Sequence, residues 1–266
     1  MVAKTRKGAR TIKDIPDDVL EDLNEGLIES VNLMEWLAVD QKYLLRQTLT
    51  KHGRMQYFPQ IDIALKQAKK PTITSINKII GESLILQAIA NDDEEWVLNL
   101  LLHPADSVRC WVCFSIAYHP NWTLKEKFEH IYTPAQDYHF GVREVAWMAM
   151  RQHIIDHLDE SLNILEEWVV DANENVRRFA SEATRPRGVW CAHISVLREH
   201  PEKALNLLNT LAQDPAKYVQ NSVGNWLNDA AKTDPDFVKT LCEEWSKLNN
   251  PNTKYIIRRA LRNTDK

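Results

Sequence analysis

The sequence predicts an all-α protein built from stacked helical repeats of the HEAT type, an α-solenoid. A Val or Ile followed by Arg or Gln recurs five times, each time after a turn rich in Asp, Asn or Pro. Successive pairs lie 34, 34, 43 and 38 residues apart, and such periods are typical of helical solenoids. Glycine is scarce, at 7 of 266 residues, and no long stretch alternates with the period of a strand. The pairs are Val108-Arg109, Val142-Arg143, Val176-Arg177, Val219-Gln220 and Ile257-Arg258.

The composition excludes several classes of protein. With 44% hydrophobic and 26% charged residues, the chain resembles ordinary soluble globular proteins. No apolar run approaches the roughly 18 residues that a membrane-spanning helix needs, and the basic N-terminus lacks the apolar segment of a secretory signal. Four cysteines are too few for a disulfide framework at this length, so we expect reduced thiols and a cytoplasmic location.

The N-terminal third is expected to cap the repeats. Residues 1–14 are basic and without periodicity, which indicates a mobile tail. The stretch Ile15-Pro16-Asp17-Asp18 then starts a helix, with acids in its first turn, that continues to about residue 32. Further helices are expected over 33–53, 60–69 and 74–91, with Pro71 breaking the pattern between the last two.

From residue 92 onward the helices are expected in pairs, and residues 15–266 should form one domain. Asp93 is expected to cap the first of these helices and Asp106-Ser107 its partner, because short polar side chains satisfy the free N–H groups of a helix start. The paired helices are expected at 94–104 with 108–120, 123–134 with 142–155, 158–170 with 176–185, 193–212 with 218–233, and 235–248 with 254–263.

The richest chemistry lies in residues 171–190, within the longest repeat interval. Arg178 and Glu182 are one helical turn apart and project from the same face. The helix then ends in the sequence Arg-Pro-Arg-Gly at 185–188, because Pro removes a helix donor and Gly tolerates positive φ. Trp190 follows directly. Three arginines, a glutamate and an indole are therefore crowded at one helix end.

Each of these residues also has a purely structural interpretation. The repeated arginines are expected to pair with an acid of the neighbouring repeat. Glu182 could form an ion pair with Arg178 or Arg185, or could be a carboxylate aimed into a groove. Asp229 lies late in a helix, where the helix dipole disfavours an acid. Indoles are more often core than ligand platforms, and this applies to Trp147, Trp190 and Trp226.

Metal and redox motifs are weak. Cys110 and Cys113 form a C-x-x-C inside an apolar helix, which favours burial in the core over metal binding. His153 and His157 are one turn apart but lack the glutamate of the H-E-x-x-H zinc motif. We therefore expect no metal and no cofactor.

At the level of motifs, the chain resembles the DNA alkylation-repair HEAT-repeat superfamily of AlkD and AlkC, and it is closer to the AlkC branch. The motifs R-x-x-x-E-x-x-R-P-R-x-x-W, at 178–190, and N-x-L-N-D, at 225–229, are its specific features. The matching segments are EWLAVDQKYLL at 35–45, HFGVRE at 139–144, NVRRFASEATRPRGVW at 175–190, YVQNSVGNWLNDAAKTDPDFV at 218–238 and TKYIIRRALR at 253–262.

The resemblance implies a monofunctional DNA glycosylase that removes N3- or N7-alkylated purines from duplex DNA as a monomer. It implies a C-shaped solenoid that holds DNA in a basic concave face, without metal or cofactor. Asp229 and Glu182 would be the catalytic carboxylates. The residues implied at the lesion or the DNA are Arg178, Trp190, Arg185, Arg187, Trp147, His139 and Glu144.

The chain departs from the family pattern at three places. Ser181-Glu182-Ala183 stands for the family's S-E-G, and Gly188-Val189 stands for its Leu-Pro. His139 occupies a position where relatives carry an acid. It could orient a water there, but a lone histidine is more often a hydrogen-bonded surface residue, and the sequence favours that interpretation. The candidates for the catalytic carboxylate are therefore, in order, Asp229, Glu182, Asp137 and Glu144.

Two alternatives stand beside the glycosylase. One is a non-catalytic relative that binds DNA structure through phosphate contacts. The other is a protein-binding HEAT scaffold, which the formal net charge of −4 favours. Both ends of the chain are basic and its middle is acidic, an asymmetry that permits an anionic partner.

Overall fold

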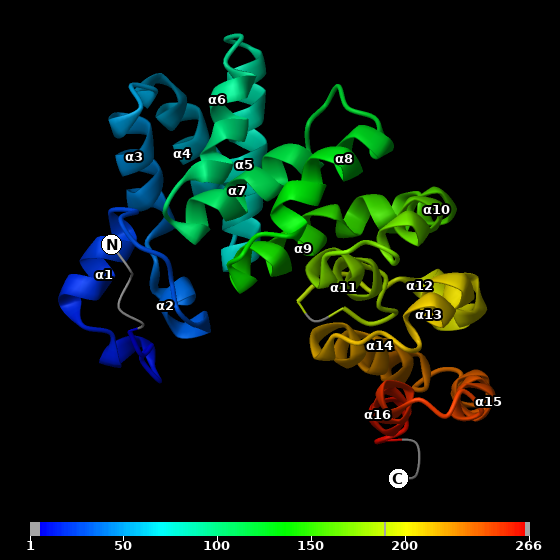
Figure 1. Cartoon of the computed structure of the whole chain (residues 1–266). Helices are drawn as coiled ribbons and strands as arrows, with labels where there is room; N and C mark the ends of the chain where they lie inside the picture. The colour runs from blue at the N-terminus through cyan, green and yellow to red at the C-terminus, as the bar shows by residue number, and fades with distance from the viewer. Residues whose placement is uncertain (1–5, 189, 264–266) are drawn as a thin grey trace. The chain divides into compact units, whose positions relative to one another are not determined.

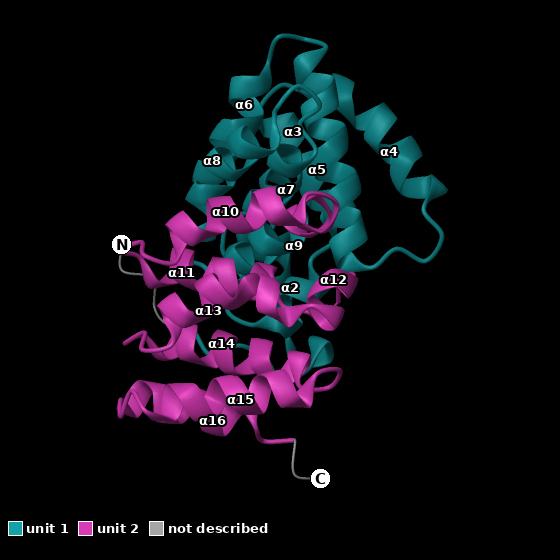
Figure 2. Cartoon of the chain, turned by 90° about the vertical axis from the view of Figure 1, so that its right-hand side faces the viewer, with its two compact units in different colours: residues 1–149 teal, residues 150–266 magenta. Residues whose placement is uncertain are grey.

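The computed structural model describes residues 6–188 and 190–263, and all regular structure in these ranges is helical. It consists of sixteen α-helices and four short 3-10 helices, so the predicted all-α repeat fold is confirmed (Figure 1). None of the helices in these ranges is long and apolar enough to cross a bilayer. The chain divides into two compact units, residues 1–149 and 150–266 (Figure 2). The single domain expected over 15–266 stays a prediction. The expected C shape stays a prediction.

The first unit begins with a segment that contacts its own first helices. Arg6 donates to the Glu29 carbonyl at 2.8 Å and pairs with Glu35, so the expected tail is held at this residue. Residues 1–5 lie outside the described residues. The elements are a 3-10 turn η1 at Ile12–Asp14, then α1 at Asp17–Asn24, α2 at Leu33–Ala38 and α3 at Gln41–Lys51.

Two of the predicted N-terminal helices were too long. The helix expected to reach residue 32 ends at Asn24, and Gly26 follows with a φ of 71°. The helix expected over 33–53 is broken after Ala38. Asp40 starts a new helix there, because its carboxylate accepts the N–H groups of Lys42 and Tyr43. Local capping thus overrides the apolar periodicity.

The rest of the first unit packs around α5 at Ile73–Ile89 and α7 at Asp106–Ala117. The two helices approach closely at Gly81, where a Cβ atom would lie 2.2 Å from the Trp111 carbonyl oxygen. Cys110 and Cys113 are buried in α7, as predicted. The neighbouring elements are η2 at Met55–Tyr57, α4 at Phe58–Gln67, α6 at Glu94–Asn99, η3 at Leu100–Leu102 and α8 at Leu124–Ala135.

The second unit has two layers of helices. The long helix α9, Phe140–Asp156, runs from the end of the first unit into the second. One layer stacks α11 at Glu174–Ala183, α14 at Lys217–Ala230 and α16 at Pro251–Ala260 (Figure 1). The other contains α10 at Leu158–Trp168, α13 at Leu205–Leu211 and α15 at Pro235–Ser246. The helix predicted over 193–212 is instead α12 at Ser195–Glu199, η4 at Pro201–Ala204 and α13, since Pro201 interrupts it.

The arginines that recur in the sequence make the same contacts in each repeat, which explains the period of the Val-Arg pattern. Arg109, Arg143 and Arg177 each donate to the backbone carbonyls five and six residues earlier, and Gln220 does the same. The expected pairing with a neighbouring acid is confirmed for Arg109 with Asp137 and for Arg177 with Asp214. These side chains fasten each turn to the helix that follows it.

The fifth predicted pair, Ile257-Arg258, is out of register. The helices α7, α9, α11, α14 and α16 begin at residues 106, 140, 174, 217 and 251, so the last interval is 34 residues and not 38. Counted from its helix start, Lys254 occupies the position of the repeat arginines. Its ammonium group donates to Asn249 in the preceding turn.

Candidate active site

Three segments of the second unit bring the strongest candidates together. Helix α11 carries Arg178 and Glu182, and Asn173 caps its start by accepting the N–H of Asn175. The chain leaves α11 at Thr184 and carries Arg185 directly after it. Helix α14, which packs beside α11, carries Asp229 near its end. Arg185 and Asp229, which are 44 positions apart in the sequence, are thus in contact.

Arg185 joins the two carboxylates. Its Nη1 donates to Glu182 Oε1 at 2.7 Å, while its Nε and Nη2 donate to Asp229 Oδ2 at 2.9 and 2.6 Å. Both carboxylates are almost fully buried. Burial of Arg185 disfavours its charged form, but the negative charges of Glu182 and Asp229 stabilise that form more strongly, so the pKa of Arg185 is raised. The predicted ion pair of Glu182 with Arg185 is confirmed.

Glu182 has two further partners. Ser222 Oγ, on α14, donates to its Oε2 at 2.7 Å, and Arg178 Nη2 lies 3.6 Å from the same oxygen. Burial alone would raise the pKa of Glu182. The charges of Arg178 and Arg185, with the hydrogen bonds, outweigh burial and hold this pKa below its ordinary value. Glu182 is therefore ionised at neutral pH and cannot act there as an acid.

Asp229 has a more exposed partner as well. Lys232 Nζ donates to its free oxygen Oδ1 at 2.9 Å, and the Lys232 side chain is 49% exposed. We call Arg178, Glu182, Arg185, Asp229 and Lys232 the Arg185 cluster. It holds three cations and two carboxylates. An excess of positive charge attracts anions, and fixed carboxylates stabilise positive charge that develops beside them.

The segment after α11 presents the exposed indole. Trp190 is 62% exposed and has a φ of 64°, a left-handed conformation that a residue with a Cβ rarely adopts. Its neighbour Val189 lies outside the described residues. Arg187 is half-buried in the same segment. The indole is thus available for contact, unlike those of Trp147 and Trp226, which are buried.

The remaining candidates lie in the first unit. Trp147 Nε1 donates to Glu144 Oε2 at 2.8 Å, so the two form a pair within α9. His139 is buried: its Nδ1 accepts the N–H of Gly141, and its Nε2 donates to the Ser30 carbonyl at 2.7 Å. It is therefore not the surface histidine that the sequence favoured. Asp137 pairs with Arg109.

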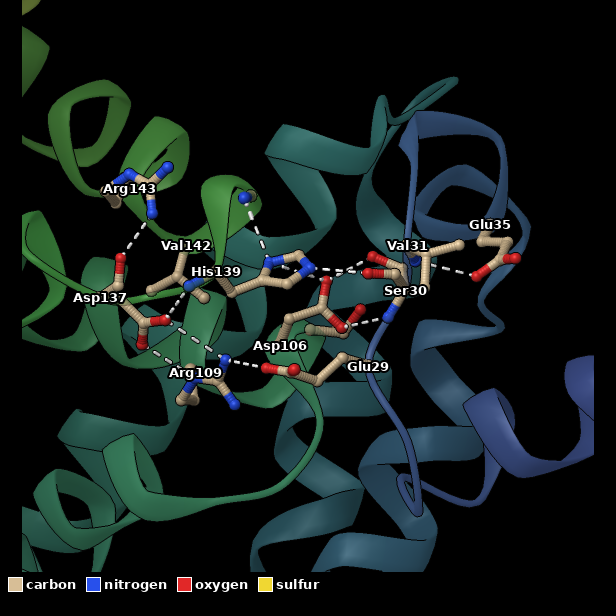
Figure 3. A network of polar contacts seen from close by, with 12 residues as sticks. Glu29, Ser30, Val31, Glu35, Asp106, Arg109, Asp137, His139, Val142 and Arg143 are labelled. Atoms are coloured by element: carbon tan, nitrogen blue, oxygen red, sulfur yellow. Dashed lines mark hydrogen bonds and ion pairs between the residues drawn. The ribbon is translucent and has the colours of Figure 1, made fainter. Parts of the chain in front are cut away.

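These contacts of His139 belong to a larger group that we call the Arg109 network (Figure 3). Arg109 pairs with Glu29 and Asp137, and it also donates to the His103 carbonyl. The Asp106 carboxylate accepts both the N–H and the Oγ–H of Ser30, at 3.0 and 2.6 Å. Asp106 is thus not the side-chain cap that was predicted for α7. The members of the Arg109 network are Glu29, Ser30, His103, Asp106, Arg109, Asp137 and His139.

Sequence reasoning missed three residues beside the carboxylates. Ser222 and Lys232 hold Glu182 and Asp229, and Arg151 donates to three carbonyls around the end of α11. Ser222 and Lys232 lie in or next to α14, which the N-x-L-N-D motif had already marked. Arg151 stands in a predicted helix with no distinguishing pattern. No cluster of three or more His, Cys, Asp or Glu side chains suited to a metal occurs within residues 6–188 and 190–263.

Part of the chain matches a known protein family. Residues 139–264, which include α9 to α16, match the family described as DNA alkylation repair enzyme. Over 114 residues the chain is 37% identical to the uncharacterized protein YhaZ of Bacillus subtilis (strain 168). That match covers 43% of this chain and 32% of YhaZ, so the chain spans only about a third of that relative.

The fold is similar to three solved structures. The Pseudomonas fluorescens alkylpurine DNA glycosylase AlkC, bound to DNA containing an abasic site analog, gives a TM-score of 0.67 at 22% identity, covering 97% of this chain and 66% of AlkC. AlkD2 from Streptococcus mutans gives 0.57 at 23% identity, covering 78% and 97%. The protein smu.31 from Streptococcus mutans UA159 gives 0.53 at 22%, covering 83% and 98%. The fold is thus closer to that of AlkC.

Proposed function

We propose that this chain, whose residues 139–264 match the family described as DNA alkylation repair enzyme, is a DNA glycosylase. It would hydrolyse the N-glycosidic bond of N3- or N7-alkylated purines in duplex DNA. One observation carries the proposal: within the family-matching residues, Arg185 bridges two buried carboxylates, Glu182 and Asp229, close in sequence to an exposed indole. The proposal includes action as a monomer in the cytoplasm, associated with the nucleoid in a bacterial cell.

The chemistry that such a substrate requires matches the cluster. An N3- or N7-alkylated purine is cationic and leaves as a neutral base, so the protein need not protonate it. The sugar becomes an oxocarbenium-like cation, and this cation needs an anion beside it and a positioned water. Glu182 is ionised at neutral pH and cannot serve as an acid, which fits a reaction that requires none.

Asp229 is the residue that we assign to the cationic sugar. Lys232, which binds its Oδ1, is half exposed and can leave it for a DNA phosphate. Arg185 would keep the other oxygen, Oδ2, in place. Trp190 is exposed and can pack against the cationic base or the sugar through its ring face. AlkC, whose fold the chain shares, has been seen bound to DNA, which supports duplex DNA as the partner.

The test is release of free base. Duplex DNA treated with a methylating agent carries 7-methylguanine and 3-methyladenine, and chromatography measures both bases after they leave the DNA. We expect release above the spontaneous rate, and a loss of about 10²-fold or more in Asp229→Asn, the size typical for the removal of an electrostatic stabiliser. Glu182→Gln should lose less, because Arg178 and Arg185 already neutralise Glu182.

A matched control is Asp214→Asn. Asp214 is also a buried, arginine-paired carboxylate of the second unit, but its partner is Arg177. This variant should lose stability and keep its rate of base release per folded molecule. No release by the wild-type protein above the spontaneous rate would remove the glycosylase assignment.

A second function is favoured by one observation. Both oxygens of Asp229 are bound by cations in the structure, so the carboxylate is already neutralised. A relative that binds DNA through its cations and performs no chemistry would have this arrangement. It predicts salt-dependent DNA binding without base release, and with Asp229→Asn leaving the affinity unchanged or higher.

A further inference from the structure

Arg151 is a buried cation whose hydrogen bonds all go to backbone carbonyls. It stands on α9 and is 2% exposed. Its Nη1 donates to the Ala183 carbonyl at 2.6 Å, its Nη2 to the Arg185 carbonyl at 2.6 Å, and its Nε to the Ala192 carbonyl at 2.9 Å. One guanidinium thus binds three points of the chain that flank or follow the end of α11.

A buried charge without a carboxylate partner is costly. None of the described acids forms an ion pair with Arg151, and its burial lowers the pKa of its guanidinium. The end of α11 offsets part of this cost, because Ala183 is the last residue of that helix and the helix dipole is negative there, and the charges of Glu182 and Asp229 also favour the charged guanidinium. A methionine or leucine would fill the space at lower cost, so the hydrogen bonds of Arg151 indicate a role beyond packing.

The hydrogen bonds of Arg151 hold both ends, or stems, of the segment 185–192 that carries Trp190. Arg185 and Ala192 stand on either side of Trp190, and their carbonyls meet on the same guanidinium. Two other contacts close the stems: Trp226 Nε1 donates to the Thr184 carbonyl, and the Ile194 N–H donates to the Pro186 carbonyl. The segment is therefore tied at its base, while the indole at its tip is exposed.

The packing inside the segment is close. A Cβ atom on Gly188 would lie 2.0 Å from Cys191 Sγ and 3.4 Å from Arg151 Nη2. Trp190 itself is held at a φ of 64°, a strained conformation that persists only when its surroundings fix it. Arg151 supplies the largest set of such fixing contacts from outside the segment.

We propose that Arg151 is a positioning residue for the active site, which fixes Trp190 and the backbone of Arg185 relative to the carboxylates of Glu182 and Asp229. It contacts no substrate. Its effect on the rate rests on the proposed glycosylase function, whereas its effect on the Trp190 segment does not. The two can therefore be tested separately in the full-length protein.

The variant is Arg151→Met, which keeps the apolar stem and removes all three hydrogen bonds. The matched control is Arg177→Met, since Arg177 also donates to two turn carbonyls of the second unit, at Asp171 and Ala172, and lies in the same repeat array. If Arg151→Met does not fold, Arg151→Lys takes its place, because it keeps the charge and can reach one carbonyl at a time.

The first readout needs no activity. The protein is labelled with 5-fluorotryptophan, and the ¹⁹F resonance of Trp190 is assigned by its loss in Trp190→Phe. We expect this resonance to shift or broaden in Arg151→Met and to stay in place in Arg177→Met. An unchanged Trp190 resonance in folded Arg151→Met, or in Arg151→Lys where that variant is used, would overturn the proposal.

The second readout is a double-mutant cycle on single-turnover base release. Arg151→Met should lower the rate by about 10²-fold, the size expected when a reacting group is misplaced by about 1 Å. Adding Arg151→Met to Trp190→Ala should cost clearly less than it costs alone, because the two act through one segment. Full additivity would mean that Arg151 acts on the rate elsewhere. If the wild-type protein releases no base, the glycosylase proposal fails and the fluorine resonance still decides the role of Arg151.

Discussion

The Arg109 network and the Arg185 cluster use the same residue types for different ends. In each, one arginine joins two carboxylates: Arg109 joins Glu29 and Asp137, and Arg185 joins Glu182 and Asp229. The other partners differ. In the Arg109 network they include backbone groups of Ser30 and of the turns, whereas in the Arg185 cluster they are side chains on α11 and α14 and the half-exposed Lys232.

This difference in partners separates a structural network from a site. A backbone group held by a side chain cannot leave without moving the chain, so the Arg109 network fixes the segment around Ser30 in one place. A lysine side chain can leave its carboxylate at little cost, because exposed ion pairs contribute only about 0–1 kcal/mol. The Arg185 cluster can therefore change partners when an anion arrives. Buried charged residues alone do not identify a site; their exchangeable partners do.

The largest effect is expected from breaking the Arg109 network. Arg109→Met removes two ion pairs and leaves the carboxylate of Asp137, whose side chain is only 10% exposed, without its cation. Removing one partner of a buried pair typically costs about 3–5 kcal/mol of unfolding free energy. Urea unfolding followed by circular dichroism measures this loss. Lys125→Met is the control, since its pair with Glu129 is exposed and should matter little. A loss as small as in that control would contradict the structural role of the network.

The same change in the Arg185 cluster should cost less stability and more activity. Arg185→Met leaves Glu182 with Ser222 and Arg178, and it leaves Asp229 with Lys232. We expect a loss of about 1–3 kcal/mol, the usual cost of a weakened buried polar group. Base release should fall by at least as much as in Asp229→Asn, because both carboxylates lose their common anchor.

For Arg185→Met, urea unfolding measures the loss of unfolding free energy, and an assay of base release on the same preparation measures the loss of activity. Arg109→Met should show the reverse order, with base release per folded molecule retained. If Arg185→Met loses more stability than Arg109→Met and keeps its activity, the distinction between the two groups is wrong.

The sequence predicted the repeat helices well because their signals are local. The Val-Arg pairs mark helix starts at α7, α9 and α11, and each arginine binds carbonyls only five and six residues back. The pair at Ile257-Arg258 misled because it has the right residue types in the wrong register. The position is in fact filled by Lys254, and only the observed start of α16 reveals this.

The site was only partly predictable. Arg178, Glu182 and Arg185 are close in sequence, so their meeting follows from helical geometry. The approach of Asp229 to Arg185 depends on how α14 packs on α11, which no local pattern encodes. Arg151 could not be found at all, because a residue that binds only backbone carbonyls leaves no complementary residue in the sequence. His139 was taken for a surface residue, since its partner Ser30 lies 109 positions away.

The Arg109 network and the Arg185 cluster should lose stability in different ranges of acid pH. Burial, with repulsion from His52, Lys51 and Arg109, lowers the pKa of His103 from 6.5 to about 4. Between these values the unfolded chain binds a proton that the folded protein refuses, so stability falls as the pH falls through this window. The pKa of Glu182 is also lowered, so its contribution is present above the ordinary glutamate range and is lost at still lower pH.

Urea midpoints at about pH 7, 5 and 3.5 check both windows. His103→Asn, whose side-chain oxygen can still accept the Ala105 N–H, should flatten the fall between pH 7 and 5. Glu182→Gln should leave the fall in stability between pH 7 and 5 unchanged. The difference in stability between Glu182→Gln and the wild type should become smaller only at the lowest pH. Equal slopes in all three proteins would mean that neither group controls the acid response.

The smallest change in stability is expected for Lys232→Met, and it tests the exchange of partners directly. The pair with Asp229 is half exposed on the lysine side, so its loss should cost about 0–1 kcal/mol. If Lys232 moves to a DNA phosphate, the slope of log affinity against log salt concentration should fall by about 0.9, the value for one phosphate contact. Lys66→Met is the matched control, because Lys66 is an exposed lysine paired with an aspartate, Asp62, in the first unit. An unchanged slope in Lys232→Met would leave Lys232 as a fixed partner of Asp229, and the Arg185 cluster would then be as closed as the Arg109 network.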